Sequence, residues 1–213
     1  MSKEMKMMVA VIVLTMVIQA GLIYLQRHLI NKLTTALLKG DYDGFDRLID
    51  KWYVMYVIAP FNVDYLKLNR YSLEGDREKI TACYDGFNNK RLNYAQAKQV
   101  YLEAFDYFLG QKDRERCLFY REKINALSSK KEDLSSIKQL VNDSYDIYID
   151  NKSDMLERLL EQNEKLPESH RGSNEALIAR IYENKGSKKK AEEYRKLSEE
   201  HLKMLLRERK KKS

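Results

Sequence analysis

Turn-forming residues recur along this chain at a nearly constant spacing, and this recurrence constrains the fold more than any other feature. Gly40-Asp41, Gly75-Asp76 and Gly110-Gln111 stand 35 residues apart, and a weaker Asn151-Lys152 pair stands 35 residues before Gly186. A period in the mid-thirties is typical of stacked helical hairpins. Only two prolines and eight glycines occur in 213 residues, and the abundant Leu, Lys, Glu, Arg, Ala and Met favour helix. The sequence therefore predicts an all-α fold.

Five hairpins can be drawn from these turns, each consisting of a first helix, a short turn and a second helix. We expect Asp76 and Ser153 to be N-caps, and the apolar run at residues 52–58 to be a helix buried on most sides. The last helix has one apolar stripe and a charged outer face, so we expect it to cap the stack. The expected limits are residues 26–39 with 41–58, 63–74 with 76–91, 94–109 with 113–127, 133–149 with 153–166, and 173–185 with 188–209.

Residues 7–25 contain no charged side chain. As a helix these nineteen residues reach about 28 Å, which nearly matches the hydrocarbon core of a bilayer. They predict an uncleaved single-pass anchor in a cell membrane, with Tyr24 at its interface, that runs directly into the first hairpin. A buried core helix and a cleaved signal peptide, with Ile18-Gln19-Ala20 as a poor cleavage site, are the alternatives. The chain then divides into a tail and anchor, residues 1–25, and a repeat domain, residues 26–213.

The side of the membrane on which the repeat domain lies is not fixed by charge. Roughly three positive charges precede the apolar segment and three follow it, so the positive-inside rule nearly ties. Cys83 and Cys117 are one repeat apart, which is too far for a disulfide between neighbouring helices. We therefore predict buried free thiols, which favour a cytoplasmic domain, whereas the short amino-terminal tail equally suits a translocated one. Both orientations remain open.

The net charge of +7 lies at the carboxyl-terminal end of the chain. From residue 185 to residue 213, twelve Lys and Arg stand against five Glu, so the remaining 184 residues sum to zero. These cations either form a solvated helix end or contact anionic lipid headgroups or RNA. No aromatic residue interleaves the terminal run, which makes nucleic acid the less expected partner. The candidate anion-contacting residues are Lys188, Lys189, Lys190, Arg207, Arg209, Lys210, Lys211 and Lys212.

The sequence offers no constellation of residues for catalysis. His28, His170 and His201 stand in separate predicted segments, without carboxylates or cysteines at metal-binding spacing. The motifs HExxH, GxSxG, GxGxxG and GxxxxGK[ST] do not occur. We therefore expect no enzyme activity, no cofactor, no metal and no small-molecule substrate.

Residues 179–194 resemble the tetratricopeptide repeat family. The likeness rests on small Ala179, Tyr182, Gly186 at the turn, small Ala191 and then Tyr194. In that family the small residues let two helices approach, and the aromatic ring fills the hole between neighbouring hairpins. The second and third hairpins echo the pattern, the first and fourth are degenerate, and the family's early Trp is missing. The resemblance implies a right-handed superhelix of four to five hairpins, with a concave groove lined by first helices.

Such a groove usually holds a peptide or a helix of another protein, and this is the partner that the resemblance implies. The sequence has fifteen tyrosines, most of which we expect in the core with their hydroxyls at its rim. The leading hypothesis is a membrane-anchored scaffold for protein binding, and the alternative is an adaptor that contacts acidic lipid headgroups or RNA through the basic last helix. The groove candidates are Tyr65, Asn69, Ser72, Tyr101, Tyr107, Arg180 and Glu183.

Overall fold

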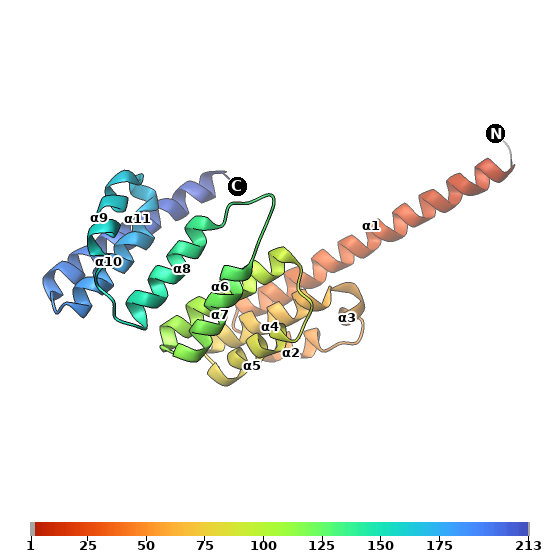
Figure 1. The fold of residues 1–213 in the computed structure, drawn as a ribbon. Helices are drawn as coiled ribbons and strands as arrows, with labels where there is room; N and C mark the ends of the chain where they lie inside the picture. Colours follow the sequence, from red (N-terminus) through yellow and green to blue (C-terminus); the bar gives the residue numbers. More distant parts are fainter. Residues whose placement is uncertain (1–2, 213) are drawn as a thin grey trace. The chain divides into compact units, whose positions relative to one another are not determined.

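The computed structural model describes residues 3–212, apart from the side chains of Lys3, Glu4, Lys6, Arg209 and Lys212. The described residues form eleven α-helices and one short 3-10 helix, and no strand occurs among them. The prediction of an all-α protein is therefore confirmed. Figure 1 shows the helices in chain order. They divide into two compact units, residues 1–91 and residues 92–213, each of which is described by itself.

The first unit packs around the carboxyl-terminal part of its first helix. Leu29, Leu33 and Leu37 are buried at intervals of four residues, which places them on one helical face. They share a core with Phe45 and Val54 from the helices that follow. The helices of this unit are α1 (Lys3–Leu38), α2 (Tyr42–Ile49), α3 (Val54–Val57), α4 (Pro60–Glu74) and α5 (Arg77–Asn88).

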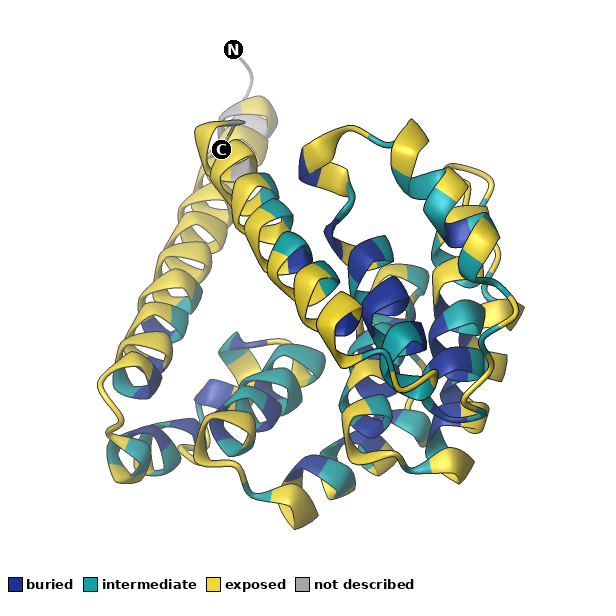
Figure 2. Ribbon diagram, turned by 90° about the vertical axis from the view of Figure 1, so that its left-hand side faces the viewer, coloured by how far each residue is buried: buried dark blue, intermediate teal, exposed yellow. Residues whose placement is uncertain are grey.

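Helix α1 is one uninterrupted helix of 36 residues, about 54 Å long at 1.5 Å per residue. Its residues 7–25 are all exposed, while Leu29 and Leu33 are buried. Figure 2 shows buried residues where helices pack together and exposed residues along most of the two long helices. The expectation that the apolar helix continues directly into the first hairpin is confirmed.

Residues 41–58, expected as one helix, form two. Helix α2 ends with Asp50 as its C-cap, and α3 begins after Tyr53. The expectation that residues 52–58 are buried on most sides is wrong, because only Val54 and Ile58 are buried and Tyr56 is 84% exposed. The physical reason is the shortness of α3, whose four residues turn one narrow face toward the core.

The second unit contains two close hairpins, α6 with α7 and α10 with α11, and helices that connect them. Asn93 and Gln96 form a capping box at the start of α6, and Asp113 caps α7 by accepting a hydrogen bond from the Arg116 amide. The helices are α6 (Tyr94–Gln111), α7 (Arg114–Ala126), α8 (Ser135–Tyr148), α9 (Leu156–Lys165), α10 (Gly172–Asn184) and α11 (Lys188–Lys212), with the 3-10 helix η1 (Glu168–His170) before α10.

Left-handed residues end most of the predicted first helices. Gly40, Gly75 and Gly186 have φ of 70°, 76° and 74°, and Asn151 has φ of 54°. Side chains with a Cβ rarely adopt this region, and glycine adopts it without strain. These four predicted turns are therefore confirmed. The N-cap expected after the Gly75 turn is also present, since Asp76 accepts a hydrogen bond from the Lys79 amide at 3.1 Å.

The turn predicted at Gly110 is wrong by two residues. Helix α6 runs on to Gln111, and the left-handed residue is Lys112, with φ of 57°. The amide of Asp113 donates to the Phe108 carbonyl at 3.1 Å, and the Asp113 side chain then starts α7. This cap fixes the turn after Gly110 rather than at it.

The N-cap expected at Ser153 is also wrong. Helix α9 begins only at Leu156 and has Met155 at its N-cap, without a capping side chain. The three residues after Ser153 include a turn at Asp154 and Met155, so the helix starts beyond the reach of the Ser153 hydroxyl. The connection that follows the Asn151 turn is therefore longer than the sequence pattern indicated.

Candidate functional site

A groove of about 420 Å³ in the second unit is lined mainly by α6, α8 and α10, which are first helices of the predicted hairpins. Helix α11 adds Leu202 to its wall. Most of the lining side chains are apolar, and Leu140 and Leu202 are 37% and 39% exposed. Further apolar side chains of the lining are Leu102, Leu109, Ile137 and Tyr148.

The groove forms because the first helices carry apolar residues on two faces. On α6, Val100, Ala104 and Phe108 are buried, and the Arg116 guanidinium of α7 lies 5.1 Å from the Phe108 ring. Leu102 and Leu109 lie seven residues apart, which places them on a second face of the same helix. That second face lines the groove. An apolar groove of this kind suits an apolar segment of another molecule.

One carboxylate, Asp106, is among the lining residues and is exposed. Its pKa is raised, first because the surrounding protein removes part of its water and then because Glu103 is nearby. Asp106 has no ion pair with another residue in the part of the chain that the structure describes. It therefore offers an exposed negative charge to a ligand in the groove, with the modest attraction that a solvated charge provides.

Tyr148 lines the groove and also contacts an arginine of α10. Burial raises the pKa of the Tyr148 hydroxyl, and the Arg180 guanidinium lies 5.5 Å from the centre of its ring. Arg180 also binds Glu183 at 2.8 Å, and Glu183 accepts a further hydrogen bond from Arg195. Hydrogen bonding from Arg180 holds the pKa of Glu183 below its ordinary value. Arg180 and Glu183, which the sequence predicted to line a binding groove, are thus already paired with other groups of the chain.

The remaining groove candidates do not gather at this groove. The Tyr101 ring packs 6.2 Å from the Tyr120 ring of α7, and Tyr107 lies edge-on to its neighbour Phe108 at 5.1 Å. Tyr65, Asn69 and Ser72 share one face of α4 in the first unit. The seven candidates therefore divide between the two units, and none of the four in the second unit lines the groove.

The residues predicted to line a groove were tyrosines and polar residues, so its apolar lining was not predicted. A usable signal was present in the sequence as a second apolar stripe on the first helices. On α8, Ile137, Leu140, Val141 and Tyr148 recur at intervals of three, one and seven residues. Helical periodicity puts these residues on one side of the helix. When the apolar surface of a helix is wider than packing against one neighbour requires, the helix has a second apolar neighbour or ligand.

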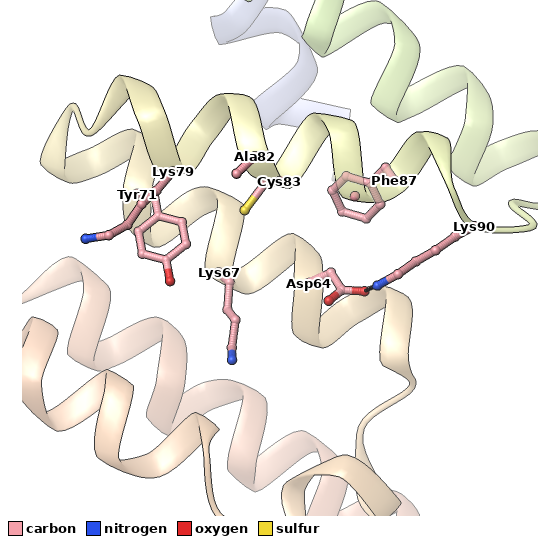
Figure 3. Close-up of a pocket in the computed structure, with 9 residues that line it drawn as sticks. Asp64, Lys67, Tyr71, Lys79, Ala82, Cys83, Phe87 and Lys90 are labelled. Atoms are coloured by element: carbon pink, nitrogen blue, oxygen red, sulfur yellow. Dashed lines mark hydrogen bonds and ion pairs between the residues drawn. The ribbon is translucent and has the colours of Figure 1, made fainter.

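A second cavity, of about 400 Å³, lies between α4 and α5 in the first unit. Figure 3 shows three lysines and the sulfur of Cys83 around it. Each lysine has a carboxylate partner, so the cavity does not present unpaired positive charge to an anion. The hydrogen bond to Asp50 raises the pKa of Lys67. The three pairs are Lys67 with Asp50 at 2.9 Å, Lys79 with Asp76 at 2.9 Å, and Lys90 with Asp64.

The basic residues of α11 do not form one patch. Lys188, Lys189 and Lys190 occupy its first turn and are exposed, and Lys190 Nζ lies 5.2 Å from the centre of the Tyr182 ring. Arg207, Lys210 and Lys211 are exposed near the other end. Lys188 and Lys211 are separated by about 34 Å of helix. The side chains of Arg209 and Lys212 lie outside the described residues.

The histidines do not meet one another at a shared centre. Among the described residues, no group of three or more His, Cys, Asp or Glu is placed to hold a metal ion. His28 stacks on Tyr24 with ring centres 6.2 Å apart, and His201 pairs with Glu175 at 2.7 Å. Cys83 and Cys117 are free thiols, as predicted, although Cys83 is only half-buried.

The fold and its groove define an all-helical protein built largely from helical hairpins, with an apolar first helix. Within the described residues, the segment Met7–Leu38 is the one helix long and apolar enough to cross a membrane, and its most apolar part is not buried. Comparisons of the chain with models of protein families, with curated proteins and with solved structures gave no match.

Proposed function

We propose that this chain is a single-pass membrane-anchored scaffold that binds an apolar segment of another protein and performs no catalysis of its own. The observation that carries the proposal is α1. Its exposed residues 7–25 contain no charge, and the same helix continues without interruption into the core of the first unit. The segment therefore requires an apolar environment that the chain itself does not supply.

A bilayer supplies that environment. Burial of a Val, Leu, Ile or Met side chain is favourable by about 1.5–3 kcal/mol, and residues 7–25 expose many such side chains along one helix. A buried core helix of this chain is disfavoured because the segment has no cover from the other helices. A signal sequence has a similar composition, so the amino terminus of the mature chain has to be measured.

The partner-binding part of the proposal rests on the groove of α6, α8 and α10. Its lining is mainly apolar, and Asp106 provides one exposed negative charge. We infer that the partner presents an apolar helix or extended segment with one Lys or Arg. The hairpin that resembles the tetratricopeptide family agrees with this use: Ala179 and Ala191 are buried, and the rings of Tyr182 and Tyr194 stack at 5.6 Å. The right-handed superhelix of that family is part of the same proposal.

The anchor is tested by expressing the full chain in cells and extracting the membrane fraction with alkaline carbonate. A spanning helix keeps the chain in the pellet, and mass spectrometry of the amino terminus shows whether residues 1–20 remain. Labelling of Cys83, or of a cysteine introduced at Ser129, by an impermeant reagent on intact cells then reports the side of the membrane. Release of an intact chain by carbonate would refute the anchor.

The groove is tested by photocrosslinking from one lining position and one matched control. Leu140 lines the groove and is 37% exposed, whereas Leu118 lies on α7 and is 36% exposed. A photoreactive residue at Leu140 is expected to capture a specific protein, and the same residue at Leu118 is not. Leu140→Asp should abolish capture from a second groove position, Leu202, without changing helix content. Equal capture from both positions would exclude the groove as the binding site.

The alternative function, contact of the basic α11 with acidic lipid or RNA, lacks a specific observation in its favour. Its cations form two groups at opposite ends of α11, so a single anionic ligand must span about 34 Å to reach both. Replacing Lys210 and Lys211 by Gln tests the carboxyl-terminal group separately. Steep loss of binding between low and moderate salt, and loss in the variant, would support the alternative.

A further inference from the structure

Three neighbouring side chains around α3 are exposed although they are large and mainly apolar. Trp52, Met55 and Tyr56 are 76%, 61% and 84% exposed, and they are called the aromatic patch below. The Trp52 and Tyr56 rings meet edge-on with centres 6.0 Å apart. Val54 and Ile58, between and beside them in the sequence, are buried, so the segment that carries the patch is packed into the core.

The aromatic patch lies on the side of the first unit from which the apolar part of α1 projects. Helix α3 contacts α1, and Val54 shares a hydrophobic core with Leu29. Figure 1 shows α3 beside α1 near the point at which the amino-terminal half of α1 leaves the bundle.

Chain geometry leads to the same placement. Helix α2 packs on α1 after the left-handed turn at Gly40, so each residue past the turn moves back toward the amino terminus of α1. Ile49 is nine residues past Gly40, which brings it to about the level of Asn31. Trp52 follows it in the connection to α3. Asn31 is only six residues, or about 9 Å of helix, from the end of the charge-free segment 7–25.

We propose that the aromatic patch inserts into the headgroup and carbonyl layer of the bilayer that α1 spans, and so fixes the first unit against the membrane surface. This inference rests on the proposed anchor. Trp and Tyr are enriched at this layer because their rings are apolar and their N–H and O–H groups remain hydrated.

Two neighbours of the patch have the chemistry of the same layer. Lys51 is exposed, with its Nζ 6.0 Å from the centre of the Tyr53 ring, and a lysine can extend its stem along apolar surface to reach lipid phosphates. Tyr24 on α1 is 72% exposed. Because α1 is continuous from residue 24 to the core residue Leu33, the patch is held near the membrane segment by a rigid element.

Trp52 permits a direct test because it is the single tryptophan of the chain. The full chain is reconstituted into phosphatidylcholine vesicles in which part of the lipid carries bromine, either near the headgroup end of the acyl chains or near their terminal methyl groups. We expect the shallow bromine to reduce Trp52 emission at least about twofold, the deep bromine to reduce it less, and aqueous iodide to have little effect.

The matched control moves the tryptophan to another exposed position of the same unit. Leu73 is 58% exposed near the end of α4, about 20 Å of helix beyond Pro60, which follows α3. In the double variant Trp52→Phe, Leu73→Trp, iodide should quench the emission and neither brominated lipid should. In a second double variant, Met55→Glu with Tyr56→Glu, the two charges should weaken insertion of the patch. Quenching of Trp52 by brominated lipid should then fall and quenching by iodide should rise, while the helix content measured by circular dichroism stays unchanged.

The outcomes separate this inference from the anchor on which it rests. If the chain floats with the vesicles but Trp52 is quenched by iodide and not by brominated lipid, the patch inference is wrong. The anchor is then still supported. A chain that does not float with the vesicles overturns both. If Trp52 is shielded from both quenchers and the chain crosslinks as a dimer, a second copy covers the patch and the lipid assignment is wrong.

Discussion

Nδ1 of His201 lies 2.7 Å from Oε2 of Glu175, and this contact joins α11 to α10 inside the second unit. Glu175 is 1% exposed, and its other carboxyl oxygen accepts a hydrogen bond from Asn163 of α9 at 3.3 Å. The donor in this pair is set by the tautomer of the His201 ring. Three helices therefore meet at one buried carboxylate.

His201→Ala is expected to destabilise the protein by about 1–3 kcal/mol, because it removes a hydrogen bond and leaves the buried Glu175 side chain with fewer partners. Urea unfolding followed by circular dichroism measures the change. The control is His170→Ala, since His170 is exposed on η1 and its loss should cost less than about 0.5 kcal/mol. Equal effects of the two substitutions would show that the buried pair contributes nothing specific.

In the first unit, the buried side chain of Arg70 links helices through hydrogen bonds in a similar way. Its guanidinium donates to both carboxyl oxygens of Asp46, at 3.2 and 3.0 Å, and also to Glu74. It lies 4.7 Å from the centre of the Tyr42 ring, and its side chain is 8% exposed. Burial opposes the charged form, but the hydrogen bonds to Asp46 and Glu74 outweigh it, so the pKa of Arg70 is raised.

Arg70→Lys is therefore expected to destabilise the protein by about 1–3 kcal/mol even though the charge is kept, because an ammonium group cannot bind Asp46 through two parallel hydrogen bonds or stack on Tyr42. Thermal unfolding of the full chain in detergent measures the loss. Arg77→Lys serves as the control, since Arg77 is exposed in the first turn of α5. A stability of Arg70→Lys within the error of that control would contradict the assigned role.

Features that depend on one or two local residues were predictable from the sequence, and features that depend on packing were not. The hairpin turns at Gly40, Gly75 and Gly186 were predictable because a glycine with positive φ is a local requirement that the sequence displays directly. The turn at Lys112 was not, because it depends on Asp113 capping the next helix and on a left-handed lysine, which composition does not indicate.

Burial is a different kind of information, because it depends on neighbours far along the chain. Residues 52–58 are apolar in sequence, which is equally consistent with a core helix and with a surface that faces lipid or protein. The groove illustrates the same limit: Leu140 and Val141 both line it from one side of α8, yet Val141 is buried and Leu140 is 37% exposed. Periodicity predicted the helices, whereas the lining of the site required the packing between them.

The two cysteines are expected to differ in reactivity. Burial raises the pKa of the half-buried Cys83 thiol above its ordinary value, and burial raises the pKa of Cys117 to about 12. Maleimide reacts with the thiolate, so labelling of the folded chain should occur at Cys83 and accelerate about tenfold per pH unit from pH 7 to 9. Cys117 should react only after unfolding in urea. Equal labelling of both thiols in the folded protein would refute the assigned burial.

The same shift predicts how stability depends on alkaline pH. The pKa of Cys117 is higher in the folded chain than the value of 9.0 expected for a free thiol, so the folded state holds this proton when the unfolded state has lost it. The resulting stabilisation is complete below about pH 9 and is lost as the pH rises toward 12. The stability difference between the native chain and Cys117→Ala should therefore shrink across this range.

Two glycine substitutions distinguish the observed turns from the turns that the sequence pattern predicts. Gly75 has φ of 76°, whereas Gly110 lies inside α6, and an added Cβ would meet no atom within 4 Å at either position. Gly75→Ala should therefore destabilise the protein by about 1 kcal/mol through backbone strain. Gly110→Ala should stabilise it by about 0.5–1 kcal/mol, because alanine restricts the unfolded chain and favours helix. Paired urea unfolding curves measure both changes under the same conditions. If Gly110→Ala destabilised the protein as much as Gly75→Ala, the turn would lie at Gly110 and the assignment of Lys112 as the left-handed residue would be wrong.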